Sequence, residues 1–155
     1  MYRLVIICLF VFGLSNLFSQ NYMTGIGVRG GLANGFSIKH FIEENKAIEG
    51  IFISRWDGFQ ITGLYEYSSV FHEDNISYFY GLGGSIGFFD GTNVPWSAST
   101  HQYTLIGIDG IAGIEYCFDN IPFSISFDYK PTFTFIGYQR VFLDNGALTL
   151  RYIMQ

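Results

Sequence analysis

Segments of about ten residues, in which polar and apolar side chains alternate with a period of two, make up most of this chain beyond residue 22. Successive side chains of a β-strand point to opposite faces, so the alternation predicts strands with one apolar and one polar face. Gly, Asn, Asp or Ser bounds each segment, as is typical of turns. The predicted strands are 22–31, 35–42, 47–56, 59–68, 76–89, 104–118, 121–134 and 146–154.

The ionised side chains of these predicted strands all fall on one of the two faces. The opposite face is aliphatic and aromatic almost throughout, with Trp56, Phe127 and Leu150 among its members. The charged face carries acids and bases in equal number, which predicts a structural network of polar side chains. Its members are Arg29, Lys39, Glu49, Arg55, Glu66, Asp109, Glu115, Asp128, Lys130 and Arg151.

The low charge content indicates which face meets the solvent. Only 14% of the residues are charged, against about 25% in soluble domains. A continuous apolar surface would aggregate in water, whereas a Lys or Arg facing lipid costs about 2–4 kcal/mol at the bilayer midplane. Lipid cannot satisfy the backbone groups of an open sheet edge, so the sheet should close. The sequence therefore predicts an all-β fold, an eight-stranded antiparallel up-and-down transmembrane β-barrel with its charged face inside.

The first residues have the features of a cleaved signal peptide. Arg3 precedes an apolar run from Leu4 to Leu14, which is too short to span a bilayer as a helix. We therefore predict a signal peptide at 1–19 and a barrel domain at 20–155, located in the outer membrane of a Gram-negative bacterium. Cleavage would leave Cys117 as the single cysteine, so no internal disulfide is expected.

Turn residues predict the registers of two hairpins. With Asp57-Gly58 as a two-residue turn, Glu49 lies opposite Glu66, an unfavourable pair unless a basic neighbour lies between them. The first hairpin needs a loop of odd length to preserve the faces, and 33–35 supplies three residues. Gly81-Leu82-Gly83-Gly84 resembles a phosphate loop, but we interpret it as strand because no helix follows.

The even strand number predicts that both termini lie on the periplasmic side. Asp119-Asn120 is then a periplasmic turn that places Asp109 opposite Lys130. The long connections, at about 90–103 and 137–145, are expected outside the cell. Loops carry function more often than the elements they join.

Two pairs of segments resemble small outer-membrane barrels of Bacteroidota. They are Ile48-Glu49-Gly50 with Arg55-Trp56-Asp57-Gly58-Phe59, and Gly107-Ile108-Asp109-Gly110 with Asp128-Tyr129-Lys130-Pro131. The resemblance implies a porin-like barrel of the size of OmpX or the OmpA membrane domain. It carries no catalytic motif.

From these features we expect an integral outer-membrane barrel with a structural or surface-interaction role and a lumen closed by side chains. We expect no catalytic residue, cofactor or metal, a monomer, and contact with outer-membrane lipid and lipopolysaccharide. A net charge of −5 with scattered bases argues against nucleic acid. Any extracellular ligand or protein should bind through the long loops, where Pro95, Trp96, Tyr103 and Tyr138 form a candidate aromatic surface.

Three alternatives remain open at this stage. The first is a lipid-modifying enzyme that uses His101 near Ser99, Thr100 and Asp90. The second is a narrow pore, and the third is a soluble lipocalin-like carrier. His72 with Glu73 and Asp74 could bind a metal weakly, but a solvated turn fits better because paired ligand spacing is absent.

Overall fold

The strands of the computed structural model follow the predicted segments closely. The structure describes residues 23–32, 34–71, 75–91, 94, 101–137, 140–143 and 146–154, so the predicted signal peptide lies outside it. The strands are β1 (Thr24–Gly31), β2 (Asn34–Glu43), β3 (Lys46–Arg55), β4 (Gly58–Val70), β5 (Ile76–Asp90), β6 (Gln102–Cys117), β7 (Phe123–Tyr129), β8 (Thr132–Ile136), β9 (Arg140–Phe142) and β10 (Gly146–Met154). Among the described residues, no helix is long and apolar enough to cross a membrane.

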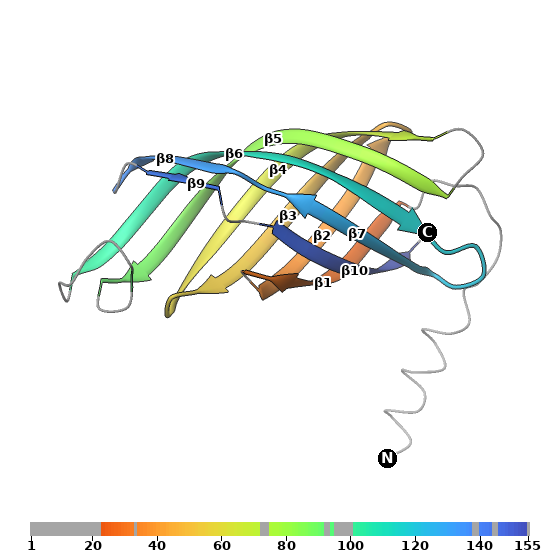
Figure 1. Ribbon diagram of the computed structural model, residues 1–155. Helices are drawn as coiled ribbons and strands as arrows, with labels where there is room; N and C mark the ends of the chain where they lie inside the picture. Colours follow the sequence, from red (N-terminus) through yellow and green to blue (C-terminus); the bar gives the residue numbers. More distant parts are fainter. Residues whose placement is uncertain are drawn as a thin grey trace, which may run out of the picture.

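The sheet closes on itself (Figure 1). β1 pairs with both β2 and β10, and β5 pairs with both β4 and β6, always antiparallel. β7 and β8 follow one path along β6, interrupted at Lys130-Pro131 because proline has no N–H to donate to the ladder. β9 extends the far end of this path by pairing with β8. The predicted eight-stranded antiparallel barrel is confirmed.

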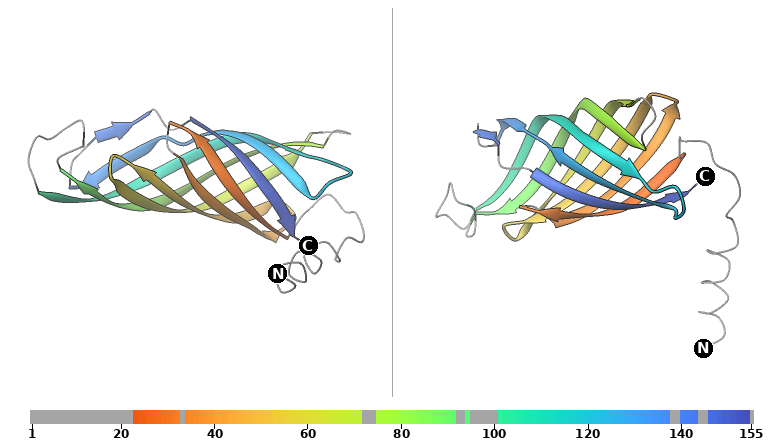
Figure 2. Two further views of the ribbon diagram at one scale, coloured as in Figure 1. Left: turned by 90° about the horizontal axis from the view of Figure 1, so that it is seen from below. Right: turned by 45° about the vertical axis from the view of Figure 1, so that its right-hand side comes forward.

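β1 begins and β10 ends at the same end of the barrel (Figure 2). Thr24 of β1 pairs with Met154 of β10, so both termini of the described chain lie at one end, the terminal end. Up-and-down connectivity places the turn between β3 and β4 and the end of β5 at the opposite, distal end. β5 ends and β6 begins at this distal end, opposite the termini.

The faces are as predicted for the strand residues. Phe127 is 56% exposed and Leu150 is 43% exposed on the outside, whereas Ser126 and Thr149 next to them are buried. Trp56 is the exception. The strand pattern predicts it on the outer apolar face, but it lies in a turn and packs against the inward-facing Phe89.

The hairpin between β3 and β4 has a register two residues away from the predicted one. Its two-residue turn is Trp56-Asp57, with φ of 52° and 51°, and Gly58 is already strand. Two positive φ values match the type I′ turn that suits the twist of a hairpin. As a result Glu49 faces Leu64 and Glu66 faces Ala47, so the two glutamates are diagonal neighbours on the inner face and not the directly opposed pair that was predicted.

The hairpin between β6 and β7 is also displaced by two residues. The connection spans 119–122 instead of a two-residue turn, and Phe118 N donates to Phe123 O at 3.0 Å across it. Asp109 therefore lies opposite Thr132, not Lys130. A shift of two residues preserves the faces, because the side-chain period of a strand is two.

The first hairpin has the odd length expected, because Arg29 and Gly35 are the last pair of β1 and β2. The predicted three-residue loop at 33–35 is nevertheless wrong, since Asn34 and Gly35 belong to β2, and residue 33 lies outside the described part of the chain. The predicted connection at 137–145 is interrupted by β9, a short strand that the alternation is too brief to reveal.

Substituting alanine at Gly83, on the inner face of β5, and at Gly84, on its outer face, tests the assignment of the two faces. A Cβ built on the inward-facing Gly83 would lie 1.9 Å from the carbonyl oxygen of Gly63, whereas at Gly84 the nearest atom is Gly107 O at 3.5 Å. We expect Gly83→Ala to lower the free energy of unfolding by about 1–3 kcal/mol, because backbone must move. Gly84→Ala should change it little. Urea unfolding of the refolded barrel measures both, and equal effects would contradict the assigned faces.

Candidate functional site

The ten charged side chains of the predicted network point toward the barrel interior. Nine are buried, and Arg55 near the distal end is half-buried. Nine of them come from seven of the strands and Lys130 lies between β7 and β8, so closure of the barrel brings together residues that are distant in sequence. Arg29 and Asp128, for example, are 99 positions apart and form a two-pronged ion pair at 2.6 and 3.0 Å.

Arg151 on β10 is the centre of the largest cluster. Its Nη2 lies 2.5 Å from Glu49 Oε1 on β3, and its Nη1 lies 3.5 Å from Glu115 Oε1 on β6. The same guanidinium donates to Ser126 Oγ at 2.7 Å and, through Nε, to Ser37 Oγ at 3.3 Å. One side chain thus links both sides of the interior.

Lys39 extends this cluster toward β4. Its Nζ lies 2.8 Å from Glu66 Oε2 and 3.6 Å from Glu115 Oε2, and all three side chains are fully buried or nearly so. The ammonium also lies over the ring of Phe79, 4.0 Å from its centroid. A buried ammonium is stabilised by carboxylates and by the negative face of an aromatic ring.

A separate group lies on β6 and the path of β7 and β8. Lys130 Nζ lies 2.6 Å from Asp109 Oδ1 and 3.2 Å from Thr132 Oγ1, and the Thr132 hydroxyl donates to the same carboxylate at 2.6 Å. The two charges meet even though they are not opposite each other, because the Lys side chain reaches diagonally across the ladder.

The interior is not purely polar, which the pattern of charges did not reveal. Five hydrophobic side chains from β3 to β6 form a buried cluster on the inner face: Ile51, Ile53, Leu64, Phe79 and Ile111. The alternation of the strands already places these five residues on the same face as the charges, so the sequence could have predicted an apolar part of the interior. Together with the ion pairs, these side chains occupy the middle of the barrel.

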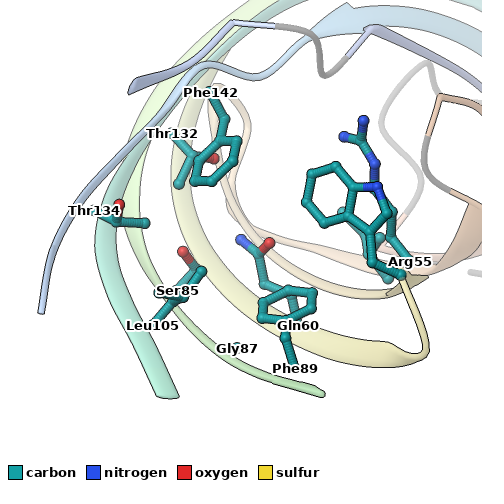
Figure 3. Close-up of a pocket in the computed structure, with 11 residues that line it drawn as sticks. Arg55, Gln60, Ser85, Gly87, Phe89, Leu105, Thr132, Thr134 and Phe142 are labelled. Atoms are coloured by element: carbon teal, nitrogen blue, oxygen red, sulfur yellow. The ribbon is translucent and has the colours of Figure 1, made fainter. Parts of the chain in front are cut away.

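A pocket opens near the distal end of the barrel (Figure 3). Its enclosed part has room for roughly one water molecule, because Trp56 and Phe142 pack against Phe89 and Leu105 there. Its lining consists of aromatic and aliphatic side chains, of hydroxyl and amide groups, and of the Arg55 guanidinium. The lining residues are Ile53, Arg55, Trp56, Gln60, Ser85, Gly87, Phe89, Leu105, Thr132, Thr134 and Phe142. We call this the distal pocket.

The catalytic candidates from the sequence are described only in part. His101, just before β6, and Asp90, at the end of β5, are both exposed and lie near each other, since Asp90 pairs with Gln102 and Gly91 N donates to His101 O at 3.0 Å. Ser99 and Thr100 lie outside the described residues. His40 faces outward and bonds Thr24 Oγ1 at 2.9 Å. Tyr103 is half-buried on β6. The other proposed loop aromatics and the segment 72–74 are not described, and the described residues contain no group of three potential metal ligands.

Two solved structures of bacterial β-barrels are similar to this chain in fold. The N-terminal β-barrel domain of OprF from Pseudomonas aeruginosa superposes with a TM-score of 0.64, covering 84% of this chain and 95% of that domain, at 12% identity. Neisserial surface protein A superposes with a TM-score of 0.51 at 14% identity, covering 84% of this chain and 93% of its own. The fold is that of outer-membrane β-barrels. No protein-family model and no curated protein matches the sequence.

These likenesses concern the backbone path and the strand number. At 12% and 14% identity they show the fold alone, so the role of the interior and of the distal pocket has to be argued from this chain's own residues.

Proposed function

We propose that this chain is an integral outer-membrane β-barrel of a Gram-negative bacterium, with a structural or surface-interaction role and a lumen closed by its own side chains. The observation that carries the proposal is the division of the two faces. Outward side chains such as Leu82, 70% exposed, and Phe36, 60% exposed, are apolar, whereas the ion pairs lie inside. A bilayer is the solvent that favours this arrangement.

The contacts in the middle of the barrel support a closed lumen. The interior of an eight-stranded barrel is just wide enough for side chains to fill. Here Arg151 connects Glu49 with Glu115, and Phe79 packs beneath the Lys39 ammonium. Such a network gives rigidity more readily than it gives a path for solutes.

The outward aromatic and aliphatic side chains would contact outer-membrane lipid and lipopolysaccharide, and the barrel would be a monomer. We propose a non-catalytic role, with recognition at the distal end. Membership of a Bacteroidota family stays a prediction from the sequence resemblance.

Fractionation and gel mobility test the location together with the closed barrel. We expect the protein in the outer-membrane fraction, and the detergent-extracted protein should migrate faster unheated than boiled, because a closed barrel resists unfolding in detergent. Recovery of the protein from the periplasm without detergent would contradict the proposal and favour a lipocalin-like carrier. A deacylation or acyl-transfer activity lost in His101→Ala would favour a lipid-modifying enzyme.

Conductance tests the closed lumen separately. The purified protein in planar bilayers should show no single-channel steps, because Arg151, Lys39 and their partners occupy the interior. Protein-free bilayers are the control for detergent leaks. Regular steps of uniform size would overturn the closed lumen without changing the membrane location.

A further inference from the structure

We propose that the middle of the barrel is a proton-binding site, in which Glu49 and Glu66 hold one proton between them. A proton held in this way links folding to pH, because the unfolded chain releases it near neutral pH. This property goes beyond the proposed structural role. It depends on the burial of the two glutamates and not on the location of the barrel in the cell.

The buried charges of the barrel do not balance. Among the described residues, nine charged side chains are buried, five acids and four bases, while Arg55 near the distal end is only half-buried. Arg29 pairs with Asp128, and Lys130 pairs with Asp109, so these four charges cancel. The central cluster that remains has three acids and two bases, namely Glu49, Glu66, Glu115, Lys39 and Arg151. One negative charge therefore has no counter-charge, and a buried charge without one is costly.

The contacts within the central cluster place the excess charge at Glu49 and Glu66. Glu115 is well satisfied, because its Oε1 accepts a hydrogen bond from Ser124 Oγ at 2.6 Å and lies 3.5 Å from Arg151 Nη1. By contrast, Glu49 Oε2 and Glu66 Oε1 have no hydrogen-bond partner in the part of the chain that the structure describes. Both side chains are completely buried, so water does not reach these oxygens from outside.

The two glutamates are also neighbours. The ladder between β3 and β4 makes them diagonal partners on the inner face, and their carboxyl groups come within hydrogen-bonding reach of each other. Two ionised carboxylates can only accept, so they cannot bond to each other. One proton makes one of them a donor and creates a short, charge-assisted O–H···O bond. It also removes the excess charge of the central cluster, and carboxyl pairs in a shared site bind one proton for this reason.

The cations around the pair are already engaged. Arg151 Nη2 lies 2.5 Å from Glu49 Oε1, and Lys39 Nζ lies 2.8 Å from Glu66 Oε2, so each carboxyl group has one cation on its other oxygen. Arg29 on β1 also acts on Glu49, but it belongs to its own ion pair. The charged groups that face the pair are thus Arg29 on β1, Lys39 on β2, Glu115 on β6 and Arg151 on β10.

A proton fits this site better than a metal ion does. The described residues contain no group of three His, Cys, Asp or Glu side chains that could hold a metal. A proton needs no coordination shell, and the two free carboxylate oxygens are sufficient to bind it.

The pH dependence of stability tests the proposal. The full-length protein and its Glu66→Gln variant, refolded in a neutral maltoside detergent, are unfolded with urea between about pH 5.5 and 7.5, where glutamates of the unfolded chain are ionised. Glutamine is neutral and can donate in place of the protonated acid. We expect the unfolding equilibrium constant of the unsubstituted protein to rise about tenfold per pH unit relative to that of the variant, because only its folded state holds a proton that its unfolded state lacks. The same pH dependence in both proteins would overturn the proposal.

Two further variants identify the pair. Glu49→Gln should also remove the extra pH dependence, since the central cluster is then balanced without a proton. Glu43→Gln is the control, because Glu43 pairs with Lys46 at the exposed terminal end, and it should keep the pH dependence of the unsubstituted protein. An extra pH dependence that survived in Glu49→Gln would contradict the assignment to this pair.

Infrared spectroscopy provides a measurement that needs no variant. At about pH 7.5 the folded protein should show the C=O band of a protonated carboxylic acid, and the band should be lost on unfolding, because exposed glutamates are ionised at this pH. Absence of the band in the folded protein would overturn the proposal. So would a stability that rises with sodium concentration at constant ionic strength without depending on pH, since the counter-charge would then be a cation.

Discussion

Replacing Arg151 with methionine should lower the free energy of unfolding by about 3–5 kcal/mol, the largest effect that we expect from a single interior substitution. The guanidinium lies 2.5 Å from Glu49 and 3.5 Å from Glu115, and all three side chains are buried. Removing it leaves two carboxylates inside the barrel without this cation, while methionine retains most of the volume. Urea unfolding of the refolded barrel, followed by gel mobility and circular dichroism, gives the measurement.

Lys46→Met is the matched control for Arg151→Met. Lys46 pairs with Glu43 at 2.6 Å on the surface of the terminal turn, where the Glu43 side chain is 57% exposed. An exposed pair is screened by water, so its loss should be hard to detect. Adding Glu49→Gln to Arg151→Met should recover part of the loss, because one of the two carboxylates is then neutral. If Arg151→Met proved as mild as Lys46→Met, the interior ion pairs would not be important for stability.

Replacing Leu82 with arginine should cost about 2–4 kcal/mol of folding free energy in lipid bilayers, since the charge would face acyl chains near the midplane. Leu82 is 70% exposed and lies in the middle of β5, with Gly110 beside it on β6. In water the same substitution on an exposed site would be harmless. Refolding into vesicles of defined chain length, with the folded fraction measured against urea, gives the difference.

Leu32→Arg serves as the control for depth in the membrane. Leu32 is 62% exposed, but it follows β1 at the distal end, where the expected cost falls to about 0–1 kcal/mol. Chemistry and exposure are thus nearly matched, and position along the barrel is the main difference. Equal small costs at both positions would mean that the outer face does not contact lipid.

Residue parity explains why the prediction of the faces succeeded when two registers were wrong. The hairpins at Trp56-Asp57 and at 119–122 are each displaced by two residues from the expected pairing. An even displacement leaves every side chain within the strands on its predicted face, and only Trp56, which moves into the turn, departs from it. Trp56 has a positive φ, which costs a non-glycine residue on the order of 1–3 kcal/mol. Tertiary contacts can offset a cost of that size, so local sequence is a weak guide to where a turn lies.

The distal pocket illustrates what a strand pattern misses. Trp56, Phe89 and Phe142 belong to a turn and to two strands far apart in the chain, and nothing in the alternation associates them. Phe89 has inward parity, which could have indicated an apolar inner mouth. For Trp56 the sequence predicts the wrong face. It follows the inward-facing Arg55, so the alternation of β3, if continued by one residue, places it on the outside.

The sequence by itself determined the all-β architecture, the strand segments and the face on which each strand residue lies, because a period of two is a local property of the backbone. The tertiary structure alone decided which charges meet, as in Arg29 with Asp128 and Arg151 with Glu49, and that Trp56 turns inward. Those contacts depend on barrel closure and on register, which are set by many long-range interactions acting together and not by any one segment.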